Sequence, residues 1–129
     1  MPQGSTTVHE EGLSAATRNL HRALVSLQEE LEAIDWYQQR VEATDDAALR
    51  EILKHNRAEE VEHAAMVLEW IRRHDAVFDA KLREFLFTEG PIVGREQALA
   101  RAEQGGPSDG GAGNGGAPVA SVGSLRGDR

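Results

Sequence analysis

The sequence feature that most limits the possible fold is a long proline-free segment. Its apolar side chains recur at alternating spacings of three and four residues. The segment begins near Leu13 and is broken only at Gln38. Such spacing places all the apolar side chains on one face of an α-helix. The polar cluster Thr44-Asp45-Asp46 supplies a stop and then an N-cap for a second helix. The apolar stripe consists of Leu20, Leu24, Leu27, Leu31, Ile34 and Val41.

The second helix, predicted from about Asp46 to Arg73, has polar side chains in the middle of its own stripe. That stripe reads Leu49, Leu53, Asn56, Glu60, His63, Val67, Trp70 and His74. A parallel apolar line, formed by Ile52, Ala64, Leu68 and Ile71, keeps the helix amphipathic. Burying a carboxylate or an imidazole costs free energy unless the group is paired or bound to a metal. The interruption at Asn56, Glu60 and His63 therefore indicates a functional site.

The apolar residues that follow predict a short third helix, with Asp75 as its cap and an end near Thr88-Glu89-Gly90-Pro91. Arg95–Glu103 is compatible with a further turn or two, but its pattern does not require them. The predicted fold class is all-α. It consists of an antiparallel two-helix hairpin with a short third helix (residues 13–91), preceded by a flexible N-terminal arm (residues 1–12).

The last forty residues have a different composition. Gly90 to Arg129 holds eleven of the thirteen glycines and three of the four prolines. Such a segment buries too little apolar surface to offset its ordering entropy, so we expect a disordered C-terminal tail. We divide it into a Gly-rich flexible linker (residues 92–121) and a terminal peptide (residues 122–129). Fewer than ninety residues remain for a core, a size at which oligomerisation often supplies the missing burial.

The composition also excludes several kinds of protein. Without cysteine the chain has no disulfide, no thiolate zinc site and no cysteine nucleophile. It has neither an apolar run of membrane-spanning length nor a signal-peptide pattern, so we expect a cytoplasmic protein that spans no membrane. The net charge of −8 disfavours nucleic acid and attracts cations. An acidic surface that serves only solubility fits that charge equally well.

Glu30 and Glu60 are predicted to lie at the same level of the hairpin. Glu30 is fourteen residues before Thr44 and Glu60 is sixteen after it, which at a helical rise of about 1.5 Å corresponds to roughly 21 and 24 Å from the turn. His63, three residues after Glu60, lies only about 60° further around its helix. In a chain with fifteen glutamates and five histidines, one Glu-x-x-His match has about even odds of occurring by chance. The match is informative because it interrupts an apolar stripe and lies opposite a second glutamate.

These three residues form half of a known type of metal site. Di-iron carboxylate bundles use one Glu from each of two helices and Glu-x-x-His from each of two others. This chain has one of each, and a two-fold axis through the site would supply the rest. A homodimer forming a four-helix bundle would then hold two metal ions, with Glu30, Glu60 and His63 from each copy. Carboxylates with one imidazole per metal suit iron or manganese, which predicts oxidation of Fe(II) by O₂.

A second cluster on the first helix, Glu29, Glu32, Trp36 and Tyr37, has two interpretations. It could be an acidic approach that gathers Fe(II), with Trp36 controlling passage. It could equally be a solvated acidic face beside an interface tryptophan, and spacing alone favours this second interpretation. Tyr37 is either a redox-active neighbour of the site or, more commonly for a tyrosine, a residue at an interface edge.

Three stretches resemble the encapsulated ferritins of bacterial nanocompartments. They are Glu29–Tyr37 (EELEAIDWY), His55–Trp70 (HNRAEEVEHAAMVLEW) and Phe85–Ile92 (FLFTEGPI), and the likeness covers roughly residues 13–92. The resemblance implies that each protomer is half a ferritin, with a ferroxidase centre at a two-fold interface and two irons per dimer. It further implies a decameric ring of dimers, with the shell protein encapsulin providing the storage volume.

The same resemblance assigns roles to individual residues. The residues that match the family's iron ligands are Glu30, Glu60 and His63. The residues that match its metal-entrance site are Glu29, Glu32 and Trp36. For the second cluster, this match favours the interpretation as an acidic approach for Fe(II). Tyr37 matches a tyrosine beside the centre.

The end of the chain resembles the peptide that directs cargo into encapsulin. Val122–Asp128 is a short apolar and glycine-bearing segment behind the predicted linker, which implies a location inside an encapsulin shell. The alternative is an unstructured tail with an incidental Leu125. For the whole protein, the rival of a ferroxidase is a non-catalytic helical assembly adaptor or an iron-sequestering module. A rubrerythrin-like peroxidase is disfavoured, because no cysteine cluster is available to deliver electrons.

Overall fold

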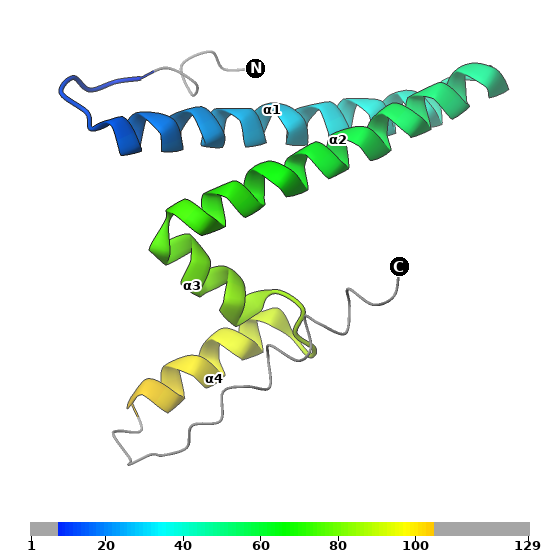
Figure 1. Cartoon of the computed structure of the whole chain (residues 1–129). Coiled ribbons are helices and arrows are strands. Elements are labelled where there is room, and N and C mark those ends of the chain that lie inside the picture. The colour runs from blue at the N-terminus through cyan, green and yellow to red at the C-terminus, as the bar shows by residue number, and fades with distance from the viewer. Residues whose placement is uncertain (1–7, 105–129) are drawn as a thin grey trace. The chain divides into compact units, whose positions relative to one another are not determined.

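The computed structural model describes residues 8–104, and the regular secondary structure within this range is all helical (Figure 1). The helices are α1 (Ala15–Ala43), α2 (Ala47–His74), α3 (Ala76–Phe85) and α4 (Ile92–Gln104). The predicted all-α class is confirmed. None of the described helices is both long and apolar enough to cross a membrane. Most of the predicted N-terminal arm, the later part of the linker and the terminal peptide lie outside the described residues.

The chain divides into two units, Met1–Asp79 and Ala80–Arg129. The first contains the hairpin formed by α1 and α2. The second contains the end of α3 and α4. Each is described by itself below.

Side-chain caps define the start of both hairpin helices. The hydroxyl of Ser14 accepts a hydrogen bond from the backbone N–H of Thr17 (3.1 Å), and Asp46 Oδ1 accepts one from the backbone N–H of Leu49 (2.8 Å). Each bond satisfies a backbone donor that has no partner within the helix. The predicted cap at Asp46 is confirmed, and α1 begins two residues after the predicted start at Leu13.

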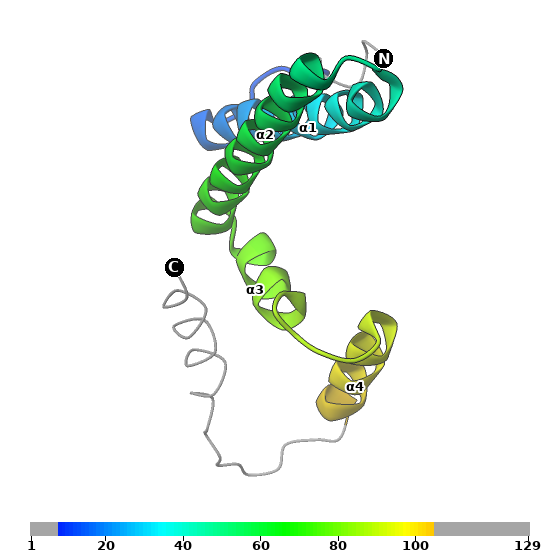
Figure 2. The ribbon, with the colours of Figure 1, turned by 90° about the vertical axis from the view of Figure 1, so that its right-hand side faces the viewer.

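The three-residue connection between α1 and α2 makes the two helices antiparallel neighbours, as Figures 1 and 2 show. Arg50 reinforces the turn, because its guanidinium donates hydrogen bonds to the backbone carbonyls of Val41 (3.2 Å) and Thr44. These carbonyls at the end of α1 would otherwise lack partners. The connection thereby fixes the relative height of residues on the two helices.

The hairpin encloses very little of its own apolar surface. Among the described residues only Ala64 and Ile71 are buried hydrophobic residues, both on α2. Most of the α1 stripe is half-buried, whereas Leu31 remains 53% exposed and Met66 on α2 remains 63% exposed. A single copy of the hairpin therefore leaves apolar side chains of both helices in contact with solvent.

The predicted third helix and its cap are confirmed. Asp75 Oδ1 accepts a hydrogen bond from the backbone N–H of Phe78 (2.9 Å), and α3 begins at Ala76. Within the first unit, Arg72 near the end of α2 donates hydrogen bonds to Glu69 (2.8 Å) and to Asp79 on the first turns of α3. This arginine therefore ties the end of α2 to the beginning of α3.

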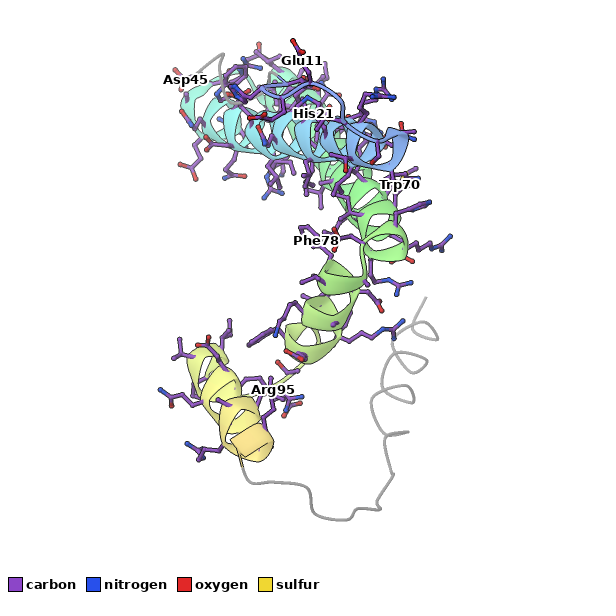
Figure 3. The ribbon with its side chains drawn as sticks, turned by 90° about the vertical axis from the view of Figure 1, so that its left-hand side faces the viewer. Glu11, His21, Asp45, Trp70, Phe78 and Arg95 are labelled. Atoms are coloured by element: carbon purple, nitrogen blue, oxygen red, sulfur yellow. The ribbon has the colours of Figure 1, made fainter. Side chains whose placement is uncertain are left out.

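The fourth helix differs from the prediction of a flexible linker over residues 92–121. The structure has α4 over the first thirteen of those residues. Gly94 is the only glycine between Ile92 and Gln104, and most of the other residues there are good helix formers such as alanine, glutamate, glutamine and arginine. Arg95, seen in Figure 3, donates a side-chain hydrogen bond to the backbone carbonyl of Glu84 (2.9 Å). The linker boundary at residue 92 is therefore too early.

Candidate metal centre

One cluster of possible metal ligands lies on the hairpin. Glu30 comes from the middle of α1, and Glu60 and His63 come from the middle of α2. Each offers a ligand atom, and these atoms all lie within 4.8 Å of one another. His63 Nδ1 is 3.4 Å from Glu60 Oε1 and 3.8 Å from Glu30 Oε1. The structure thus brings together the three residues that the spacing argument placed at one level.

The cluster lies at the surface of the hairpin and not inside it. The side chains of Glu30 and Glu60 are each 24% exposed, and the His63 side chain is 45% exposed. Two helices alone cannot surround a site between them, so one side stays accessible. Further ligands from another chain can reach the cluster from that side.

The two carboxyl groups of the cluster lie close enough to shift each other's pKa. The pKa of Glu30 is raised, chiefly by hydrogen bonding to Glu60, with burial and the negative charge of Glu60 adding to it. The same bond is the main cause of a lowered pKa at Glu60, and a hydrogen bond with His63 lowers it further. Two carboxyl groups this close to each other hold one proton between them more readily than two separate carboxyl groups would. A bound cation would replace that proton.

The other ring nitrogen of His63 faces a different carboxylate. His63 Nε2 is 3.9 Å from Glu59 Oε1, while Glu59 Oε2 is 3.9 Å from His55 Nε2. Glu59 was not among the predicted site residues. Its position four residues from each histidine was the sequence signal that could have found it.

The second predicted cluster lies along α1, outside the three-residue cluster. Tyr37 is two turns from Glu30 on the same helix face and is half-buried, whereas Trp36 is about half exposed. The Arg40 guanidinium lies 5.8 Å from the centre of the Trp36 ring and 5.5 Å from that of Tyr37. Both distances suit a cation–π contact, which links the two aromatic side chains through one arginine.

A shallow, open groove of about 400 Å³ lies between α1 and α2, about one helical turn from the cluster. On α1 its lining includes Ser26, one turn before Glu30, and on α2 it includes Val67, one turn after His63. Trp70, labelled in Figure 3, lines the groove and stacks on His74 with ring centres 3.9 Å apart. The remaining lining residues are Asn19, Arg22, Ala23 and Met66.

The profile of one protein family, described as EncFtn-like, matches residues 5–89, a range that contains the whole cluster. This chain belongs to the EncFtn-like family. An "Encapsulated ferritin-like protein" of Rhodospirillum rubrum is 52% identical over 131 residues, covering 99% of this chain and 94% of the relative. A "Ferritin-like protein" of Thermotoga maritima is 53% identical over 85 residues, covering 66% of this chain and 75% of the relative.

A solved structure has a similar fold. The crystal structure of protein ne0167 from Nitrosomonas europaea matches with a TM-score of 0.62 and 60% sequence identity, covering 64% of this chain and 90% of that chain. The family resemblance stated from the sequence is therefore confirmed. Membership of this ferritin-like family is consistent with an iron-related function. Two carboxylates and one imidazole are donors that fit iron.

Proposed function

We propose that this EncFtn-like chain is a ferroxidase, which oxidises Fe(II) to Fe(III) with O₂ at a di-iron centre formed between two copies. The observation that supports it most is the Glu30, Glu60 and His63 cluster, whose ligand atoms lie within 4.8 Å of one another on an open face. The ions bound there are the substrate. Family membership supports the choice of iron among the metals that this donor set fits.

The donor set argues for a shared site. Three side chains are too few to satisfy one six-coordinate ion, and they leave one side accessible. A two-fold axis beside His63 would bring a second copy of each residue to that side. Four carboxylates and two imidazoles then suffice for two ions, with carboxylates able to bridge them at the roughly 3.5–4 Å spacing of two-metal sites.

The exposed apolar side chains support the same arrangement. Leu31 follows Glu30 and Met66 lies three residues after His63, and both are more than half exposed in the single chain. Covering one such side chain contributes about 1.5–3 kcal/mol before ordering costs. A second hairpin packed on this face would bury both the cluster and its apolar border, giving a four-helix bundle. Assembly of such dimers into a decameric ring is the expectation that the resemblance to encapsulated ferritins adds.

The proposed roles follow from where each side chain lies. Glu30 and Glu60 give up their shared proton when Fe(II) binds, and His63 contributes a neutral nitrogen. Two Fe(II) ions held side by side supply one electron each, which together allow a two-electron reduction of O₂. Glu29, Glu32 and Trp36 form the proposed entrance site on α1. Tyr37, on the same face as Glu30, is the proposed neighbour of the centre.

The proposed destination is the interior of an encapsulin shell in the cytoplasm, where the oxidised iron would be stored. The name of the Rhodospirillum rubrum relative, an encapsulated ferritin-like protein, supports this destination. The chain's own support is the cargo-like segment Val122–Asp128, which lies outside the described residues. The shell protein is thus the proposed partner, and the terminal peptide of residues 122–129 the proposed contact.

The test is to load the protein with Fe(II) without oxygen, admit air and follow the absorbance of Fe(III). We expect rapid oxidation by the wild-type protein and oxidation at the protein-free rate by Glu60→Ala and His63→Ala. Wild-type protein that binds Fe(II) but does not accelerate its oxidation would instead support a sequestering or adaptor role. Equal oxidation by the wild type and both variants would refute the assignment of the centre.

A further inference from the structure

Arg40 lies where one side chain can reach both aromatic residues of α1. Trp36 and Tyr37 are adjacent in the sequence and therefore point about 100° apart around the helix. Arg40 follows one turn later, about 40° around the helix from Trp36 and about 60° from Tyr37, so it lies between them. Long helical side chains lean toward the N-terminus of their helix, which carries this guanidinium back over the two rings. Its distances of 5.8 Å from the Trp36 ring centre and 5.5 Å from that of Tyr37 agree with this placement.

The two rings belong to different faces of α1. Trp36 is seven residues after Glu29 and four after Glu32, which places it on the face of the proposed entrance. Tyr37 is seven residues after Glu30, which places it on the face that carries the metal cluster. A single guanidinium therefore contacts one side chain of the entrance face and one of the cluster face.

We propose that Arg40 is a positioning residue, which holds the rings of Trp36 and Tyr37 in fixed orientations and so links the proposed entrance to the centre. Within residues 8–104 its guanidinium makes no ion pair or hydrogen bond that competes with the two rings. Arginine suits this position, because its planar guanidinium stacks on aromatic rings, whereas lysine carries a compact charge. This inference deepens the proposed function, since it rests on the roles given there to Trp36 and Tyr37.

The charge of Arg40, acting alone, would have the opposite effect on iron capture. Trp36 is 48% exposed and shares its face with two glutamates, so a cation beside it repels incoming Fe(II). If only the charge acted, Arg40→Lys would behave like the wild type and Arg40→Met would capture Fe(II) more readily. If Arg40 positions the rings, lysine keeps part of the function. Methionine, which has a long side chain without the charge, loses it.

The first measurement follows both rings without any metal. The chain has two tryptophans and one tyrosine, so fluorinated tryptophan and tyrosine give three ¹⁹F signals in the full-length protein, with Trp36 assigned by its loss in Trp36→Phe. In Arg40→Met we expect the Trp36 and Tyr37 signals to shift together and to narrow, because both rings gain mobility. Arg40→Lys should give smaller shifts. The Trp70 signal should stay in place in every variant, since that ring lies on α2.

Arg18→Met is the matched control, because it removes an exposed arginine from the start of the same helix, and the contact of that arginine is with the backbone carbonyl of Leu13. It should leave all three ¹⁹F signals unchanged. Helix content should be the same in all variants, since methionine is a good helix former. Affinity for Co(II) should also be unchanged in the Arg40 variants, because Arg40 does not belong to the ligand cluster.

The second measurement is kcat/KM for Fe(II) oxidation. Cation–π contacts at exposed sites correspond to a preference of about two- to fivefold, so we expect kcat/KM to fall by about that factor in Arg40→Met. The decrease should be smaller in Arg40→Lys and absent in Arg18→Met. A rise in Arg40→Met, with Arg40→Lys equal to the wild type, would show that the charge alone acts.

Two results would overturn the proposal. One is an Arg40→Met protein whose Trp36 and Tyr37 signals match those of Arg18→Met. The other is a kcat/KM in Arg40→Met that equals or exceeds that of the wild type. The ¹⁹F measurement needs neither iron nor O₂. A wild type that fails to accelerate Fe(II) oxidation would therefore count against the ferroxidase function, while the ¹⁹F signals would still decide whether Arg40 holds both rings.

Discussion

The carboxyl groups of Glu30 and Glu60 meet across the seam between α1 and α2, with ligand atoms within 4.8 Å of each other, and this proximity raises the pKa of Glu30 and lowers that of Glu60. Glu30 holds its proton to a higher pH than an ordinary glutamate, while Glu60 loses its proton at a lower one. The pair therefore resists carrying two negative charges when no cation is present. A metal ion relieves that repulsion by replacing the proton.

Metal binding should therefore weaken as the pH falls. Above the raised pKa of Glu30 both carboxylates are ionised and binding releases no proton from the pair. Below it, each binding event must displace the proton from Glu30, so affinity falls with decreasing pH. Calorimetric titration with Co(II) in two buffers of different ionisation enthalpy measures both the affinity and the protons released. An affinity that stays constant on acidification through the titration of Glu30 would contradict the shared-proton description.

Glu30→Gln should raise stability and abolish activity together. The sign follows from the raised pKa of the carboxyl group in the folded protein, which makes ionised Glu30 unfavourable at neutral pH. Glutamine keeps the side-chain length and removes that charge. The metal-free variant should melt at a slightly higher temperature than the wild type at neutral pH, with no such difference at a pH below the titration of both carboxyls. Its Fe(II) oxidation should be no faster than that of a protein-free control.

Much of this site could be predicted from the sequence because helices convert spacing into position. The apolar stripe fixed which face of α1 turns inward, and the polar cluster at Thr44-Asp45-Asp46 located the turn. Counting residues from that turn was enough to place Glu30 level with Glu60. The result depends on both helices being regular between the turn and the site, which the absence of internal proline and glycine ensures.

What the sequence did not reveal depends on single contacts or on local composition. Glu59 lies 3.9 Å from His63 Nε2, and this proximity depends on the direction of the His63 ring, which spacing does not specify. Helix α4 was expected only as a further turn or two over Arg95–Glu103, because its glycine-poor residues were averaged with the glycine-rich residues that begin at Gly105. The capping contacts of Arg50 with Val41 and Thr44 likewise depend on a long side chain reaching back over the turn.

Glu32→Ala and Trp36→Ala should change the rate of oxidation without abolishing metal binding. Neither residue belongs to the cluster of Glu30, Glu60 and His63. Removal of an acidic side chain from the proposed entrance should slow capture of Fe(II) at low concentration, and the effect should diminish in high salt, which screens the attraction. Stopped-flow oxidation and Co(II) titration separate the two effects. Glu42→Ala, an acidic change near the end of the same helix, provides the control. A variant that no longer binds metal would place that residue among the ligands.

Glu69→Gln should reduce stability, and the difference should vanish in acid. Hydrogen bonds from Arg72 and Arg73 lower the pKa of Glu69 from 4.5 to about 2. A lowered pKa contributes stability that is present above the ordinary pKa and is lost as the pH falls from about 4.5 to about 2. Because the Glu69 side chain is 43% exposed, solvent screening limits the loss at neutral pH to about 1 kcal/mol or less. Urea unfolding at pH 7 and near pH 2 measures it. Glu51→Gln, with its exposed partner Lys54, should show a smaller change.

The end of the chain should direct the protein to the encapsulin shell and should not take part in Fe(II) oxidation. Residues 105–129 contain nine glycines, and their compact apolar element is the segment from Val122 to Leu125. A docked peptide of this size could bury only a few side chains, each contributing about 1.5–3 kcal/mol before ordering costs. One tail should therefore bind weakly. Several tails on one oligomer, engaging a shell with many equivalent sites, should bind far more tightly through their high effective concentration.

Deletion of residues 119–129 should therefore leave oligomeric state and Fe(II) oxidation unchanged while eliminating co-purification with encapsulin. Leu125→Asp offers a finer test, since it keeps the length of the chain but makes the apolar element unfavourable to bury. Val119→Asp, which places the same charge outside Val122–Asp128, is its matched control and should still load. Native mass measures the oligomeric state, and the oxidation assay measures the activity. Co-expression with the shell protein measures loading. A truncated protein that enters the shell as efficiently as the full chain would refute the targeting role.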